Sequence, residues 1–230
     1  MIDKNDKSSI YDKPEWKSEG VTPKDFFDQC GYMVIKGYLP KPLALYFKNY
    51  LHFRSEIDDD MAGGDPDVPN CKCVYGDLSF DVLMEMSRNS IETYLGVSLI
   101  SQYTYARIYY HPNELRQHTD RPECEYSASL CLGYDGEEIW PLNFIDRKGK
   151  SRSIKLESGD IVLYKGNELE HGRPPFEGKR QYQLFMHYVE KEGKYGDRIF
   201  DGRKNLGLRK IEPDSSSSIH ETTLLNKMGI

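Results

Sequence analysis

Residues 102–110 read QYTYARIYY, a run rich in the aromatic and β-branched side chains that favour strands. Comparable runs follow at EYSASLCLGY (125–134), IWPLNFID (139–146), SRSIKLESGDIVLYKG (151–166) and RQYQLFMHYV (180–189), with turn signals between them. From residue 100 onward the pattern therefore predicts strands. Several strands at such short spacing indicate a sandwich or barrel, so we expect a mainly β fold.

The part of the chain before residue 98 has helical spacing instead. Thr22 and Pro23 have the residue types of an N-cap and a first helical position. A helix is predicted in KPLALYFKNYLHF (41–53), and a second over 79–95. The apolar face of the first comprises Leu43, Tyr46, Phe47, Tyr50 and Leu51. GYMVIKGYLP (31–40) is strand-like. We expect these N-terminal helices to pack on one face of the β part.

The length of 230 residues suits one domain. We expect a polar arm over 1–20, a single domain over 21–190, and a charged tail over 191–230 that contains the Ser215–Ser218 run. Within the domain, helical support would occupy 21–97 and the β core 98–190. The stretch 57–77, IDDDMAGGDPDVPNCKCVYGD, is predicted to be a long loop, either a lid or a solvated connection.

Composition narrows the possible partners. A net charge of −6 and a pI near 5.6 give no basic surface for nucleic-acid phosphates or an anionic membrane. No apolar run approaches the roughly 20 residues that span a bilayer, and the N-terminus has no signal-like stretch. We therefore expect a soluble, cytoplasmic protein. Five cysteines favour reduced thiols, and the CxC pair Cys71 and Cys73 has no second pair at zinc spacing.

The segment RQHTDRPECEY (116–126) carries a candidate metal motif. If His118 ends a strand, Asp120 points to the same side. Two imidazoles and one carboxylate can hold one face of an Fe(II) ion. A second imidazole is available in ELEHGRPPFEGKR (168–180), where His171 precedes a loop of prolines and glycine, and Arg180 follows nine residues later. On these residues alone, HxD is a weak signal, and a solvated turn explains it equally simply or better.

The order of HxD, a distal His and an Arg nine residues beyond it resembles the Fe(II)/2-oxoglutarate-dependent dioxygenases, in particular their prolyl-4-hydroxylase-like branch. YTYARIYYHPNELRQHTD (103–120) and LESGDIVLYKGNELEH (156–171) resemble the family's segments that lead to its ligands. The resemblance covers roughly residues 30–190 and implies a double-stranded β-helix, or jelly-roll-like core. It also implies iron ligands at His118, Asp120 and His171, with Arg180 on the distal carboxylate of 2-oxoglutarate and Tyr109 bordering that cosubstrate.

The resemblance further implies an activity. Fe(II), 2-oxoglutarate and O₂, with ascorbate in support, would hydroxylate a substrate C–H bond and release succinate and CO₂. We expect a peptidyl, prolyl-type substrate. A free amino acid or other small acidic molecule is an alternative, because Arg107, Arg121 and Arg173 would suit it at the cavity mouth; Arg173 also rivals Arg180 for the cosubstrate. A non-catalytic jelly-roll binding protein and a zinc hydrolase are further alternatives, but zinc hydrolysis assigns Arg180 no role.

Other polar residues carry open alternatives. Arg107 shares its strand face with Tyr109, so we expect it in the cavity, paired with a substrate acid or an internal carboxylate. Trp140 would either shape the substrate mouth or belong to the core. His187 alternates with Arg180 along its strand, and we interpret it as a packed structural histidine. The remaining histidines at 52, 111 and 220 show no partner pattern.

Overall fold

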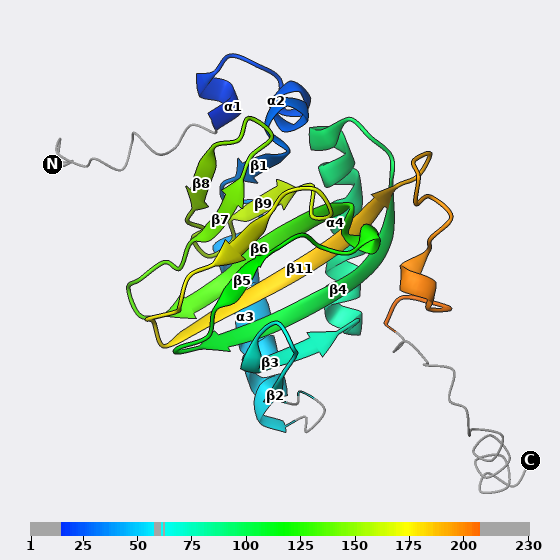
Figure 1. Cartoon of the computed structure of the whole chain (residues 1–230). Helices are drawn as coiled ribbons and strands as arrows, with labels where there is room; N and C mark the ends of the chain where they lie inside the picture. Colours follow the sequence, from blue (N-terminus) through cyan, green and yellow to red (C-terminus); the bar gives the residue numbers. More distant parts are fainter. Residues whose placement is uncertain (1–14, 58–60, 62, 208–230) are drawn as a thin grey trace, which may run out of the picture.

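Two antiparallel sheets face each other in this computed structural model, which describes residues 15–57, 61 and 63–207 (Figure 1). The larger sheet has the strand order β1-β9-β6-β11-β4-β3-β2, and the smaller has β5-β10-β7-β8. The larger sheet contains β1 (Tyr32–Ile35), β2 (Gly63–Gly64), β3 (Pro69–Tyr75), β4 (Leu99–Tyr110), β6 (Tyr126–Asp135), β9 (Ile161–Tyr164) and β11 (Arg180–Glu190). The smaller contains β5 (Leu115–His118), β7 (Leu142–Ile145), β8 (Ser151–Ile154) and β10 (His171–Arg173).

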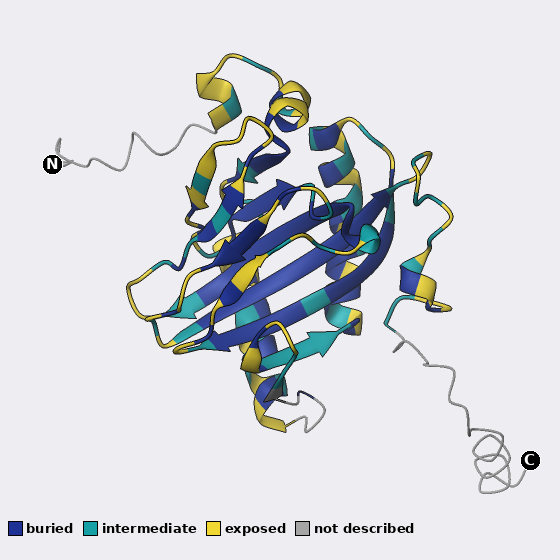
Figure 2. Cartoon of the chain, in the orientation of Figure 1, coloured by how far each residue is buried: buried dark blue, intermediate teal, exposed yellow. Residues whose placement is uncertain are grey.

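The three long strands β4, β6 and β11 form the centre of the larger sheet. β11 pairs with β4 over its whole length and with β6 over most of it. Figure 2 shows these strands almost entirely buried, and every residue of β11 between its two ends is buried. One face of β11 packs toward the helices and the other faces the smaller sheet. A strand covered on both faces has a nearly continuous apolar sequence.

Helices cover the outer face of the larger sheet. Figure 1 shows α3 and α4 lying behind it, where α3 contacts β6 and α4 contacts β4. The Thr22 side chain accepts a hydrogen bond from the Asp25 amide, as predicted for an N-cap. Asp77 caps α4 in the same way, and Gly96 ends that helix with a φ of 68°. The helices are α1 (Glu15–Ser18), α2 (Pro23–Cys30), α3 (Lys41–Ile57) and α4 (Leu78–Leu95), with 3-10 turns η2 (Pro122–Cys124) and η3 (Phe200–Gly202).

The buried face of α3 differs from the predicted one. Its buried residues are Ala44, Phe47, Leu51 and Ser55. Tyr46 was expected to face inward, but 60% of it is exposed. The buried positions recur every three or four residues starting from the small Ala44, which lets the helix approach the sheet closely. The apolar residues that precede Ala44 and Phe47 therefore remain on the solvent side.

The predicted long loop over 57–77 is wrong in its second half. β3 begins at Pro69, pairs antiparallel with β4, and places Lys72 opposite Ile108. A proline at the first position is compatible with a strand because it removes no ladder hydrogen bond there. Residues 58–60 and 62 lie outside the described residues. Because β1 and β3 both join the larger sheet, the N-terminal half supplies strands as well as helices.

Part of the predicted C-terminal tail packs against the domain. Asp201 and Arg203 are both buried, and the Arg203 guanidinium lies 2.8 Å from the Asp81 carboxylate of α4. The serine run from 215 to 218 lies outside the described residues, as do residues 1–14 of the predicted arm. Across residues 15–57, 61 and 63–207, none of the helices has the length and apolar character required to cross a bilayer.

Candidate metal centre

Strand pairing in the smaller sheet brings the two candidate histidines together. His118 is the last residue of β5 and lies opposite His171, the first residue of β10. Their ring centroids are 4.5 Å apart. Residues 118 and 171 are distant in sequence, so the antiparallel register of β5 and β10 is what places them side by side.

Asp120 completes the group from just beyond the end of β5. Its Oδ1 lies 3.3 Å from His118 Nε2 and 3.6 Å from His171 Nε2. Ligand atoms at right angles on a metal with bonds of about 2.1 Å would be roughly 3 Å apart. The Asp120 amide donates a hydrogen bond to the Gly166 carbonyl at 2.8 Å, and the Ser127 hydroxyl lies 3.3 Å from Asp120 Oδ2. Both contacts hold the carboxylate toward the two imidazoles.

The hydrogen bonds of the two imidazoles suit metal binding. His118 Nδ1 lies 2.9 Å from the Arg116 carbonyl, and His171 Nδ1 lies 2.8 Å from the Leu169 carbonyl. A carbonyl only accepts, so each neutral ring carries its proton on Nδ1 and leaves the Nε2 lone pair facing Asp120. The hydrogen bond with Asp120 raises the pKa of His118, and burial lowers the pKa of His171. These donors fit a divalent transition metal.

A cavity of about 500 Å³ opens over this group. The triad forms part of its wall. Its remaining lining includes four tyrosines (Tyr75, Tyr103, Tyr105 and Tyr164), and apolar side chains such as Leu142 and Phe185. Asp65, Asp67, Arg107 and Arg121 also reach it. The cavity could therefore receive a substrate next to the three converging ligand atoms.

Both cavity arginines have carboxylate partners within the chain. Arg121 donates two hydrogen bonds to Asp201, at 2.8 and 2.9 Å. Arg107 pairs with Asp65 and donates to the Tyr109 hydroxyl at 3.0 Å. The expectation that Arg107 faces the interior with Tyr109 thus agrees with its placement, and its partner is an internal carboxylate.

The structure places Arg180 away from the triad. Its guanidinium Nε lies 2.5 Å from Asp135, and 27% of its side chain is exposed. The next residue on the same strand face, Tyr182, contacts His52 of α3. Arg180 therefore lies on the helix-covered face of the larger sheet and not on the face that lines the cavity. Its expected role beside the triad requires a side-chain direction that β11 does not provide.

Arg173 and Trp140, expected near the mouth, lie inside the sandwich. Only 3% of Arg173 is exposed, and only 5% of Trp140. The Trp140 indole donates to the Pro174 carbonyl at 2.8 Å and packs edge-on against Tyr109 at 4.9 Å. Trp140 is therefore a core residue.

Two residues near the triad, Gly166 and His187, were missed or assigned a purely structural role. A Cβ on Gly166 would lie less than 3.0 Å from the Asp120 carboxylate, so a glycine is needed there. His187 lines the cavity, and its Nδ1 lies 2.9 Å from Ser127 Oγ; burial lowers its pKa to about 4. The opposite parity of His187 and Arg180 was visible in the sequence, but it did not say which of the two faces the cavity.

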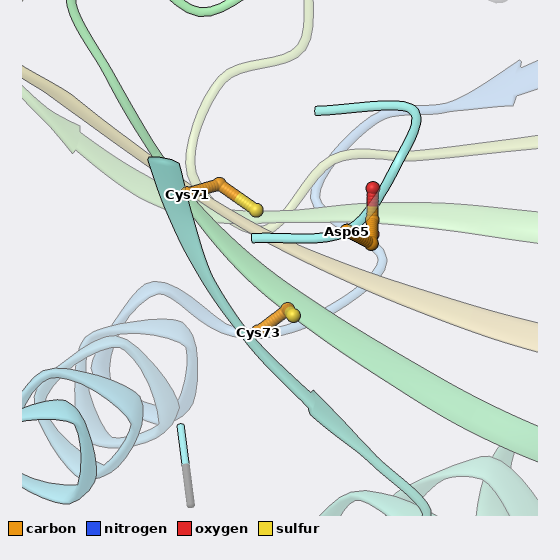
Figure 3. A group of neighbouring side chains, drawn as sticks. All are labelled: Asp65, Cys71 and Cys73. Carbon is orange, nitrogen blue, oxygen red and sulfur yellow. The ribbon is translucent and has the colours of Figure 1, made fainter. Parts of the chain in front are cut away.

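A second group of side chains gathers around the CxC pair. Figure 3 shows Cys71 and Cys73 on β3 with Asp65 facing them, and their ligand atoms lie within 4.8 Å of one another. The Asp65 carboxylate is already engaged: one oxygen accepts from Tyr105 and Arg107, and the other accepts from two backbone amides. Since a carboxylate has about four acceptor positions, a metal would have to displace one of these donors.

Comparisons with known proteins identify the fold. No family model matches the chain, and no curated protein matches it. Solved structures do: a prolyl-4-hydroxylase from Pseudomonas putida has a TM-score of 0.59 at 16% identity, covering 72% of this chain and 96% of that one. HygX from Streptomyces hygroscopicus, solved with nickel and 2-oxoglutarate, has a TM-score of 0.57 at 16% identity, covering 73% and 86%.

A third similar structure is the non-haem α-ketoglutarate-dependent epimerase SnoN from nogalamycin biosynthesis. Its TM-score is 0.61 at 12% identity, and the match covers 83% of this chain and 91% of that one. The chain therefore has the double-stranded β-helix fold of the 2-oxoglutarate-dependent oxygenases, which confirms the predicted fold class.

Proposed function

We propose that this protein is an Fe(II)- and 2-oxoglutarate-dependent oxygenase that hydroxylates a C–H bond of its substrate. The observation that supports this most directly is the convergence of His118, Asp120 and His171 at the cavity wall. Two imidazoles and a carboxylate on one side of an ion leave its other coordination positions open. The fold shared with 2-oxoglutarate-dependent enzymes supports the same proposal.

The roles of the protein groups follow from their contacts. His118, Asp120 and His171 would hold the metal, and the carbonyl partners of the two Nδ1 atoms fix the ring orientations. When bound, Fe(II) with 2-oxoglutarate and O₂ would supply the oxidising chemistry, with succinate and CO₂ released. Leu142 and Phe185 place apolar surface beside the site, which limits the access of water to it.

The electrostatics of the cavity support a substrate without strong negative charge. Arg107 and Arg121 are each neutralised by a carboxylate, while Asp67 is an exposed acid at the same cavity. The case for a small acidic substrate depended on free arginines at the mouth. We therefore propose a peptidyl substrate. The hydroxyls of Tyr75 and Tyr105 already donate to Asp201 and Asp65, so toward a peptide backbone their oxygens would act as acceptors.

The proposal is tested by binding and turnover in sequence. The whole protein is titrated anaerobically with Fe(II) and then with 2-oxoglutarate, and the visible absorption of the chelate is followed. Aerobic incubation with ascorbate and a peptide library should then give succinate and products one oxygen atom heavier, detected by mass spectrometry. His118→Ala should abolish metal binding, whereas His52→Ala removes an imidazole on α3 and should not. Metal binding without any 2-oxoglutarate binding would refute the proposal.

A further inference from the structure

Arg173 is a buried cation that lacks a carboxylate partner among the residues described. Its Nη1 donates to the Trp140 carbonyl at 2.9 Å, and its guanidinium lies 5.0 Å from the centre of the Trp140 ring. Its Nε is buried without any hydrogen-bond partner. A buried charge without a counter-ion is costly, so this arrangement indicates a place for an anion.

Two more unpartnered polar atoms belong to the interior around Arg173. They are the Nε of Arg107 on β4 and the Oε1 of Gln181 on β11. Gln181 lies 3.4 Å from Cys131, and Cys131 and Arg107 are both electrostatic neighbours of Arg173. Buried polar groups are normally satisfied. Among the described residues, the unpartnered Nε–H groups of Arg173 and Arg107 indicate a ligand that accepts hydrogen bonds.

The position of Arg173 matches the length of a five-carbon dicarboxylate. His171 and Arg173 are separated by one residue on β10, and the extra residue of the irregularity between them lies on β5. Their side chains therefore point to the same side of β10 at roughly 6.5 Å spacing. The two carboxyl carbons of 2-oxoglutarate are four C–C bonds apart, or about 5 Å when extended. A molecule chelating a metal at His171 would thus carry its far carboxylate to Arg173.

On the basis of the proposed function, we infer that Arg173, and not Arg180, binds the distal carboxylate of 2-oxoglutarate. Arg180 is neutralised by Asp135 on the opposite face of β11. Arg173 lies between the sheets, on the strand that carries His171, and its Nε–H has no hydrogen-bond partner among the described residues. A guanidinium can bind a carboxylate through two parallel hydrogen bonds, and burial strengthens these bonds.

The test compares matched arginine variants of the whole protein. Arg173→Met removes a positive charge from between the sheets, and Arg180→Met removes one from the helix-covered face of the larger sheet. Each variant is loaded anaerobically with Fe(II). Calorimetric titration should show that the affinity for 2-oxoglutarate falls roughly 100-fold or more in Arg173→Met and less than about threefold in Arg180→Met. Fe(II) affinity, measured separately, should stay within about threefold in both.

Pyruvate, which keeps the chelating end but lacks the distal carboxylate, provides a second measurement. The unmodified protein should prefer 2-oxoglutarate to pyruvate, and Arg173→Met should lose that preference. Should that variant not fold, Arg173→Lys keeps the charge without the planar fork. This variant should bind 2-oxoglutarate roughly tenfold more weakly and bind pyruvate with unchanged affinity.

The outcomes separate the two proposals. The assignment of Arg173 would be overturned if the Arg173 variants kept the full preference for 2-oxoglutarate over pyruvate. It would also be overturned if Arg180→Met lost 2-oxoglutarate affinity by more than about threefold. Either result would leave the oxygenase proposal intact. If the unmodified protein bound Fe(II) but no 2-oxoglutarate, the proposed function itself would fall, and this inference with it.

Discussion

Replacing Gly166 by alanine should displace the carboxylate of Asp120 without removing any ligand. The added Cβ would lie 2.5 Å from Ser127 Oγ and also too close to Asp120 Oδ2. Ordinary carbon–oxygen contacts begin near 3.3 Å, so these groups must shift by roughly 1 Å. Ligands need to be held within about 0.5 Å, and changes behind a metal ligand typically cost 10–100-fold in affinity. We therefore expect metal binding to weaken by about 1.4–2.8 kcal/mol.

The assay is calorimetric titration of the metal-free protein with Fe(II) under anaerobic conditions, at a temperature where both proteins are folded by circular dichroism. Gly193→Ala serves as the control, because its Cβ would crowd Glu190 at 2.9 Å in a region away from the triad. Its metal affinity should equal that of the unmodified protein. Unchanged affinity in Gly166→Ala would refute the argument that the close approach of the backbone sets the position of Asp120.

Three further predictions concern stability and reactivity. Asp81→Ala removes the carboxylate that faces Arg203 in a fully buried pair, so urea denaturation should show a loss of about 3–5 kcal/mol; a loss below about 1 kcal/mol would contradict this. Arg180→Met, at the partly exposed pair with Asp135, should cost less than about 1 kcal/mol in the same experiment. The hydrogen bond from the neighbouring Cys71 thiol lowers the pKa of Cys73. Alkylation by iodoacetamide should thus rise with pH at a midpoint below the roughly 8.5 of an ordinary thiol and disappear in Cys73→Ser; a midpoint at or above about 8.5 would contradict this.

The candidate ligands were predictable because the decisive pattern is local. His118 and Asp120 are two residues apart at a strand end, and a period of two places them on one side whatever the rest of the fold does. The distal His171 required the additional signal of a strand and turn that resemble a known arrangement. The opposition of His118 and His171 depends on the pairing of β5 with β10, which no single segment encodes.

The direction of Arg180 was not predictable in the same way because β11 is buried on both faces. A strand with one solvent-exposed face shows its orientation by alternating apolar and polar residues. The sequence of β11, RQYQLFMHYV, does not show which of its faces points to the cavity, because both faces are buried. Which parity faces the cavity is decided by the packing of α3 against Tyr182, a contact between distant segments. Arg173 was placed at the mouth because two prolines follow it, yet β10 continues through it into the interior.

The pairing of β5 with β10 has a mechanical consequence for the smaller sheet. These strands have four and three residues, so few backbone hydrogen bonds hold them together. An ion bound by His118, His171 and Asp120 would cross-link both strands and the segment beyond β5. At a free concentration 100 times its dissociation constant, it would add about 2.7 kcal/mol to the cost of separating them. The bound ion would therefore stabilise the pairing of β5 with β10. Amide hydrogen exchange in these two strands should slow on metal loading more than exchange in the long strands of the larger sheet.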